Sequence, residues 1–109
     1  MVTINRKQRE LIFKAIADPT RREILARLRM GPSTVGEIAQ NFRTSRPAIS
    51  KHLRLLRNAG LVVTRKEGAA SVCELNGKPL RAVNEWLQDY AEFWDENLRN
   101  LKRFVEEKQ

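Results

Sequence analysis

The chain has 109 residues, of which 41% are hydrophobic and 31% are charged, and its formal net charge is +8 at pH 7. This length suits one domain around one hydrophobic core. No apolar run approaches the ~20 residues of a membrane span, the N-terminus lacks the apolar stretch of a signal peptide, and Cys73 is the only cysteine. These features exclude a membrane-spanning protein, an internal disulfide and an intrachain thiolate metal cluster. They predict a cytoplasmic location.

Two helices are predicted in the first third of the chain. Asn5 has the spacing of an N-cap for a helix that ends near Ala17. Asp18 and Pro19 then supply the N-cap and the first residue of a second helix. The Gly-Pro pair at residues 31–32 ends that helix.

A second pair of helices follows after a short break. Thr34 and Glu37 have the T-x-x-E spacing of a capping box and predict the start of a short third helix. Ser45 caps a fourth helix, which the glycine at position 60 ends. The fourth helix places apolar residues on one side and basic residues on the other, and its apolar residues are Ile49, Leu53 and Leu56.

The remainder of the chain predicts a hairpin and one long helix. Residues 61–65 and 71–75 are short strand patterns, and the glycine at position 68 between them indicates a turn. Cys73 has the strand parity of a core-facing residue. The last helix is predicted from about Leu80 to about Glu107, which is roughly 40 Å at 1.5 Å per residue.

Positive charge is concentrated in the middle of the sequence. Residues 38–66 carry seven basic side chains and no acidic one, whereas residues 78–109 carry six basic and seven acidic side chains, a net charge of −1. A helix that shows only positive charge to water suits the phosphate backbone of a nucleic acid duplex. Double-stranded DNA is therefore the predicted partner.

The order of elements predicts a mainly α protein with a small β-hairpin. Two helices joined by a tight turn and followed by a two-stranded hairpin make a winged helix-turn-helix, here with about five helices in all. The second helix of the pair enters the DNA major groove. Its first residues face base edges because the buried side chains fix its opposite face.

The chemistry of the side chains assigns a role to each position in this interface. Arg46 has the length for a bidentate contact to guanine O6 and N7. Ser50 and Lys51 reach bases or phosphates, and Pro47 reaches a thymine methyl group. The remaining predicted contacts are to phosphates, and the complete predicted set is Thr44, Ser45, Arg46, Pro47, Ser50, Lys51, Arg54, Arg57, Arg65 and Lys66.

Three motifs resemble the ArsR family of bacterial and archaeal winged-helix repressors: DPTRREIL at residues 18–25, SRPAISKHL at 45–53 and LRNAGLV at 56–62. The resemblance spans roughly residues 13–104. It implies a homodimer, operator binding, repression of transcription and control of the chain's own gene. It also implies a recognition helix at residues 45–58 whose base-reading positions fall on Arg46, Pro47, Ser50 and Lys51.

The sequence departs from the metal-sensing members of that family. Residues 26–30 lack the Cys-x-Cys motif of thiol sensors, and the last helix lacks the histidine ligands of zinc sensors. The resemblance is therefore to the autorepressor branch without a metal site, and no metal or cofactor is expected. The sequence offers no nucleophile with an oriented partner, so an enzyme is not expected either. His52, the only histidine, lies at the edge of the buried face and is interpreted as a hydrogen-bonded boundary residue, with a phosphate contact as the alternative.

The last helix carries an apolar stripe wider than one small core can cover. We interpret it as a homodimer interface, with residues 79–107 as the dimerisation part of a single domain at 1–109. Two alternatives stay open. One is a small-molecule pocket lined by Trp86, Tyr90, Phe93 and Trp94, whose ligand releases the repressor, and the other is a helix that recruits a different protein. The predicted interface residues are Leu80, Val83, Leu87, Tyr90, Trp94, Leu98 and Leu101.

Overall fold

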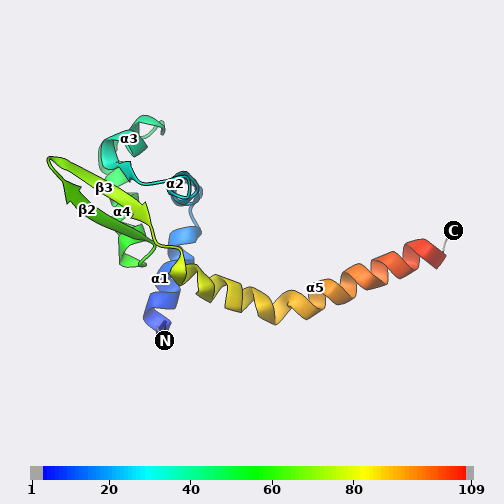
Figure 1. Ribbon diagram of the computed structural model, residues 1–109. Coiled ribbons are helices and arrows are strands. Elements are labelled where there is room, and N and C mark those ends of the chain that lie inside the picture. Colours follow the sequence, from blue (N-terminus) through cyan, green and yellow to red (C-terminus); the bar gives the residue numbers. More distant parts are fainter. Residues whose placement is uncertain (1–3, 108–109) are drawn as a thin grey trace.

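The structure is a computed structural model that describes residues 4–107. Within that range the chain forms five α-helices, one short 3-10 helix and three short strands (Figure 1). Their order along the chain is α1 Arg6–Ile16, α2 Pro19–Leu28, β1 Ser33–Thr34, α3 Val35–Gln40, α4 Arg46–Asn58, β2 Val62–Glu67, β3 Ala70–Leu75, the 3-10 helix Lys78–Leu80 and α5 Arg81–Glu107.

The first four α-helices begin at the side chains that the sequence predicts. The Asn5 carboxamide oxygen accepts the amide of Gln8 at 2.8 Å and caps α1. Thr34 and Glu37 form the reciprocal capping box of α3. Each cap satisfies an amide that the first helical turn leaves without a partner. The helix boundaries are thus fixed by local chemistry.

The sheet has three strands, not the two predicted. Its order is β1-β3-β2, all antiparallel, and Ser33 and Thr34 pair with Cys73 and Val72. A two-residue strand has no periodicity of its own, so only the neighbouring β3 reveals it. The turn between β2 and β3 is Gly68-Ala69, and Gly68 has φ +61°, the positive φ that two-residue hairpins favour at their first position.

The hydrophobic core lies where α1, α2, α3, α4 and the sheet meet. Its fully buried side chains include Ile12, Ile24 and Ile38, and Cys73 is also buried, which confirms the parity prediction. Leu80 and Val83, predicted for the dimer interface, pack against this core and are partly buried by it. They lie where α5 leaves the body, so the protomer itself already covers much of their surface.

Most of α5 extends away from the body of the protein. Figure 1 shows the β2–β3 hairpin at one end of the molecule and the C-terminal part of α5 projecting from the other. The radius of gyration is 18.7 Å, well above the ~13 Å of a compact chain of this size. Within residues 4–107, no helix is long and apolar enough to cross a membrane.

Gly60 connects α4 to the sheet in a conformation that side chains resist. Its φ is +80°, its amide donates to the Arg57 carbonyl at 2.9 Å, and the Leu61 amide donates to Leu56 at 3.0 Å, the pair of bonds of a Schellman ending. A Cβ at this position also lies 3.2 Å from the end of the Gln8 side chain.

We therefore expect Gly60→Ala to lower the free energy of unfolding by about 1–2 kcal/mol because alanine resists positive φ. Gly77→Ala is the matched control, since Gly77 has φ −79° and a Cβ there meets nothing within 4 Å. Urea denaturation measures both variants. Equal stability of the two would contradict this account of the α4 ending.

Candidate nucleic-acid interface

The helix α4 presents a fixed polar face because its opposite face is anchored in the core. Ile49, Leu53 and Leu56 are all fully buried. The residues on the other side are exposed, as the sequence predicts, and they are Arg46, Pro47, Ser50, Lys51, Arg54 and Arg57. The rotation of α4 about its axis is thus set by packing, and its exposed polar residues need no contact of their own to hold it.

The N-terminal end of α4 combines a cap with an arginine. Ser45 Oγ accepts the amide of Ala48 at 3.3 Å, which leaves its hydroxyl hydrogen free to donate to another acceptor. Thr44 lies beside it and is exposed. The Arg46 guanidinium extends toward α3, where its Nη2 lies 4.0 Å from the position that a Cβ would take on Gly36. This end of α4 suits an anion and a hydrogen-bond acceptor at once.

The cations along α4 have no acidic neighbour to neutralise them. In the described part of the chain, none of Arg46, Lys51, Arg54 and Arg57 forms an ion pair with a carboxylate. Unpaired exposed cations on one face keep their full charge for a polyanion. The positive charge that the sequence assigns to this segment is therefore available at the surface.

The β2–β3 hairpin, which is the wing of the fold, differs from α4 because one of its cations forms ion pairs. Arg65 donates to Glu74 at 2.7 Å and to Glu67 at 3.1 Å, so two carboxylates surround its guanidinium. Register explains the contact, because Glu67 is two residues along the same face of β2 and Glu74 is the diagonal neighbour on β3. The strand pairing is the signal that would have found this cluster. Lys66 is exposed and unpaired among the described residues.

Two carboxylates near the helix pair serve as caps. The Arg21 amide bonded to Asp18 lowers the pKa of that carboxyl, and the Thr34 amide lowers the pKa of Glu37. Hydrogen bonds to the ionised form favour it. Both groups are thus held as anions that begin α2 and α3, a structural use rather than proton transfer.

His52 is a boundary residue with a side-chain partner, as predicted. Its Nδ1 lies 3.2 Å from Arg21 Nη1 and 3.9 Å from Asp18 Oδ2, and its side chain is 22% exposed. The interaction joins the middle of α4 to the start of α2. No sequence pattern indicates Arg21 as the partner, because the two residues are 31 positions apart.

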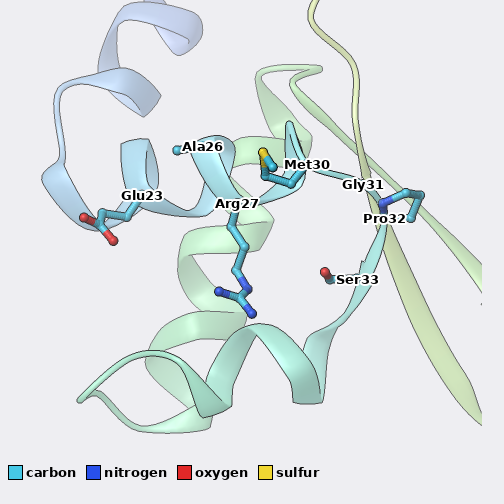
Figure 2. Close-up of a pocket in the computed structure, with 7 residues that line it drawn as sticks. All are labelled: Glu23, Ala26, Arg27, Met30, Gly31, Pro32 and Ser33. Atoms are coloured by element: carbon cyan, nitrogen blue, oxygen red, sulfur yellow. The ribbon is translucent and has the colours of Figure 1, made fainter.

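A shallow surface pocket lies at the end of α2 and the start of β1 (Figure 2). Its seven lining residues include Glu23, Arg27 and Met30. None of them belongs to the aromatic stripe of α5, where the sequence places an alternative ligand site. Among residues 4–107, no group of three or more His, Cys, Asp or Glu side chains is placed to hold a metal ion.

The core-anchored helix with its cationic face and the adjoining hairpin define a winged-helix, DNA-binding regulator of transcription. The family model described as "Bacterial regulatory protein, arsR family" matches residues 18–64. The transcriptional repressor SdpR of Bacillus subtilis is 38% identical over 80% of this chain and 97% of its own length. The HTH-type transcriptional regulator Rv2034 of Mycobacterium tuberculosis is 38% identical over 86% of this chain and 85% of its own.

Solved structures agree with the sequence comparison. The crystal structure of an ArsR family transcriptional regulator has a TM-score of 0.75 and 39% identity, and the match covers 87% of this chain and 97% of that one. The chain belongs to the ArsR family. This confirms the resemblance carried by its three motifs and the predicted winged helix-turn-helix fold.

The paired state of Arg65 gives a prediction about the wing. Replacing both of its partners, Glu67→Gln with Glu74→Gln, frees the guanidinium, and we expect tighter binding to random duplex DNA. We also expect the log–log slope of affinity against salt to steepen by about 0.9, the contribution of one phosphate contact. Fluorescence anisotropy over a salt series measures the slope.

The control removes the same two charges at exposed positions outside the wing, Glu10→Gln with Glu23→Gln. It changes net charge equally but frees no arginine. If the two double variants have the same salt slope, Arg65 is not restrained by its carboxylates.

Proposed function

We propose that the protein is a homodimeric repressor that binds a pseudo-palindromic operator with one α4 helix in each of two major grooves. The observation that carries this proposal is α4 itself, which buries three apolar side chains completely and exposes unpaired cations on its other face. A helix held in this way presents the same residues to every duplex it meets. This role involves no catalysis, and it places the protein with the genome in the cytoplasm.

Each residue predicted at the DNA interface has a proposed contact. Arg46 reads a guanine, while Pro47, Ser50 and Lys51 contact neighbouring base edges or phosphates. Thr44 and Ser45 hold a phosphate at the helix N-terminus. Backbone phosphates are bound by Arg54, Arg57 and Lys66. For Arg65 the ion pairs support a different role from the predicted phosphate contact, that of ordering the wing.

The surface of α5 supports a second copy of the chain as its partner. Trp94, Leu98 and Leu101 are 64%, 62% and 59% exposed, and Leu87 and Tyr90 continue the same apolar face. A continuous apolar face on an extended helix is stabilised when another protein surface covers it.

Charge along α5 favours antiparallel pairing with that copy. Residues 85–96 carry five carboxylates and no cation, whereas residues 99–103 carry three cations and no carboxylate. An antiparallel pair that crosses near residue 96 brings Asp89 toward the partner's Arg103 and Trp94 toward the partner's Leu98. A parallel pair sets like charges side by side. The self-complementary pattern is what a two-fold symmetric interface requires.

Ring contacts support a packing role for the aromatic residues where α5 begins. Phe13 on α1 lies 5.6 Å from Trp86, centroid to centroid, and Trp86 lies 5.3 Å from Tyr90, both edge to face. Such geometry stabilises packed aromatic pairs. These rings attach α5 to α1, which supports a packing role for Trp86 and Tyr90.

Selection from a pool of randomised duplexes tests the DNA-binding proposal. We expect an inverted repeat whose half-sites lie about 34–36 Å apart or a multiple of that distance. The selected sequence then locates sites on the genome, beginning upstream of the chain's own gene, and a reporter fused to that site should be repressed. Enrichment of no sequence, or activation of the reporter, would overturn the proposal.

Arg46→Ala should relax the base preference at one position in each half-site and cost about 1–3 kcal/mol on the selected duplex. Arg57→Ala is the control at the far end of the same helix, because a phosphate contact weakens all sequences alike. Anisotropy titrations on the selected duplex and a scrambled duplex separate the two effects. The same ratio of selected to scrambled affinity in both variants would contradict the assignment of Arg46.

Leu98→Glu should convert the dimer into a monomer and abolish tight operator binding, since a carboxylate then lies in an apolar interface. Asn100→Glu is the matched control, two residues along and on the opposite side of α5. Sedimentation equilibrium gives the mass of each variant. A wild-type chain that sediments as a monomer would instead favour a different protein as the partner of α5.

A further inference from the structure

Arg21 connects three separate helices through one guanidinium. Its Nε donates to the Ala15 carbonyl at 2.8 Å and its Nη2 to the Lys14 carbonyl at 3.0 Å, both at the end of α1. Its Nη1 lies 3.2 Å from His52 Nδ1 on α4. Its own amide donates to Asp18, the N-cap of α2, at 3.0 Å. All three kinds of guanidinium nitrogen are therefore engaged.

The contact with Arg21 selects one tautomer of the neutral His52 ring. Arginine stays charged and can only donate. Nδ1 of His52 must therefore accept, which puts the single ring proton of the neutral imidazole on Nε2. The charged groups that face this ring among the described residues are Arg21 and, at 3.9 Å, Asp18, both from α2. From α1, the contacts reach Arg21 through backbone carbonyls alone.

The contacts of Arg21 lie between the two proposed functional surfaces of the protein, the apolar face of α5 and the cationic face of α4. On one side, α1 packs on α5 through the edge-to-face contact of Phe13 and Trp86. On the other side, His52 follows Lys51 directly on α4. The core residues of α4 are hydrocarbon and resist rotation only through packing, whereas a hydrogen bond to a fixed arginine also defines the position of α4 along its axis.

We propose that Arg21 is a positioning residue for operator recognition, which holds α4 through His52 at a set orientation relative to α1 and the base of α5. The inference rests on the proposed function. The expected effect is on the ratio of the affinity for the selected duplex to the affinity for random DNA. If α4 is misplaced, its base contacts are lost and this ratio falls, whereas phosphate contacts form on any sequence. Neither residue needs to touch DNA for this effect.

The test measures the affinity ratio between the duplex selected by the wild-type protein and a scrambled duplex. Arg21→Lys keeps the charge but cannot span the three acceptors, and we expect the ratio to fall about tenfold, the equivalent of one hydrogen bond to a charged group. Arg22→Lys is the matched control. Arg22 donates to the Ile16 carbonyl at 2.8 Å and has no hydrogen bond or ion pair with α4 among the described residues, so the affinity ratio of Arg22→Lys should stay at the wild-type value.

Two substitutions of His52 separate positioning from folding. His52→Asn retains an acceptor close to the position of Nδ1 and should keep the wild-type ratio, whereas His52→Ala should lower it as Arg21→Lys does. Thermal denaturation of each variant confirms that binding is measured on folded protein. Rescue by asparagine but not alanine is the expected result, and equal ratios for the two would overturn the role of His52.

If the wild-type protein selects no sequence, the proposed function fails; if it does and Arg21→Lys keeps the full ratio, this inference alone fails.

Discussion

The burial of Ile49, Leu53 and Leu56 is the constraint on which the rest of the structure depends. Each of these side chains contributes about 1.5–3 kcal/mol when fully buried, and together they fix which side of α4 faces water. The cations on the other side gain little from folding, since none of them forms an ion pair within residues 4–107. Stability and recognition are thus assigned to opposite faces of one helix.

Among the described residues, positive charge is neutralised at Arg65 in the wing and left free along α4. In the wing, Glu67 and Glu74 surround Arg65 at 3.1 Å and 2.7 Å, and Lys66 is the adjacent cation without such partners. A wing with balanced charge adds little sequence-independent attraction to DNA. Because phosphate contacts strengthen binding to every sequence alike, this balance favours discrimination by α4 over general affinity.

The parts of the fold that follow from neighbouring residues were predictable from the sequence. The caps at Asn5, Asp18, Thr34 and Ser45 act within one helical turn, so their spacing is visible in the chain. Contacts between distant segments were not. The strand β1, the partners of Arg65 and the Arg21–His52 contact depend on register or on helix packing, which a single sequence does not display. Leu80 and Val83 have the same period as the exposed residues of α5, so periodicity alone does not show that the core partly covers them.

In the proposed homodimer, dimerisation and operator recognition become one problem of geometry. Half-site spacing is a fixed length on DNA, so two α4 helices read both half-sites only if rigid contacts connect each of them to the dimer axis. In this chain those contacts run from α5 to α1 through Trp86 and Phe13, and from α1 to α4 through Arg21 and His52. A flexible connection at any step would let each α4 bind its own half-site with the affinity of a monomer. Linking two sites raises affinity only when their geometry allows both to be occupied together, and specificity in a dimer of this kind therefore depends on side chains that need not touch the DNA.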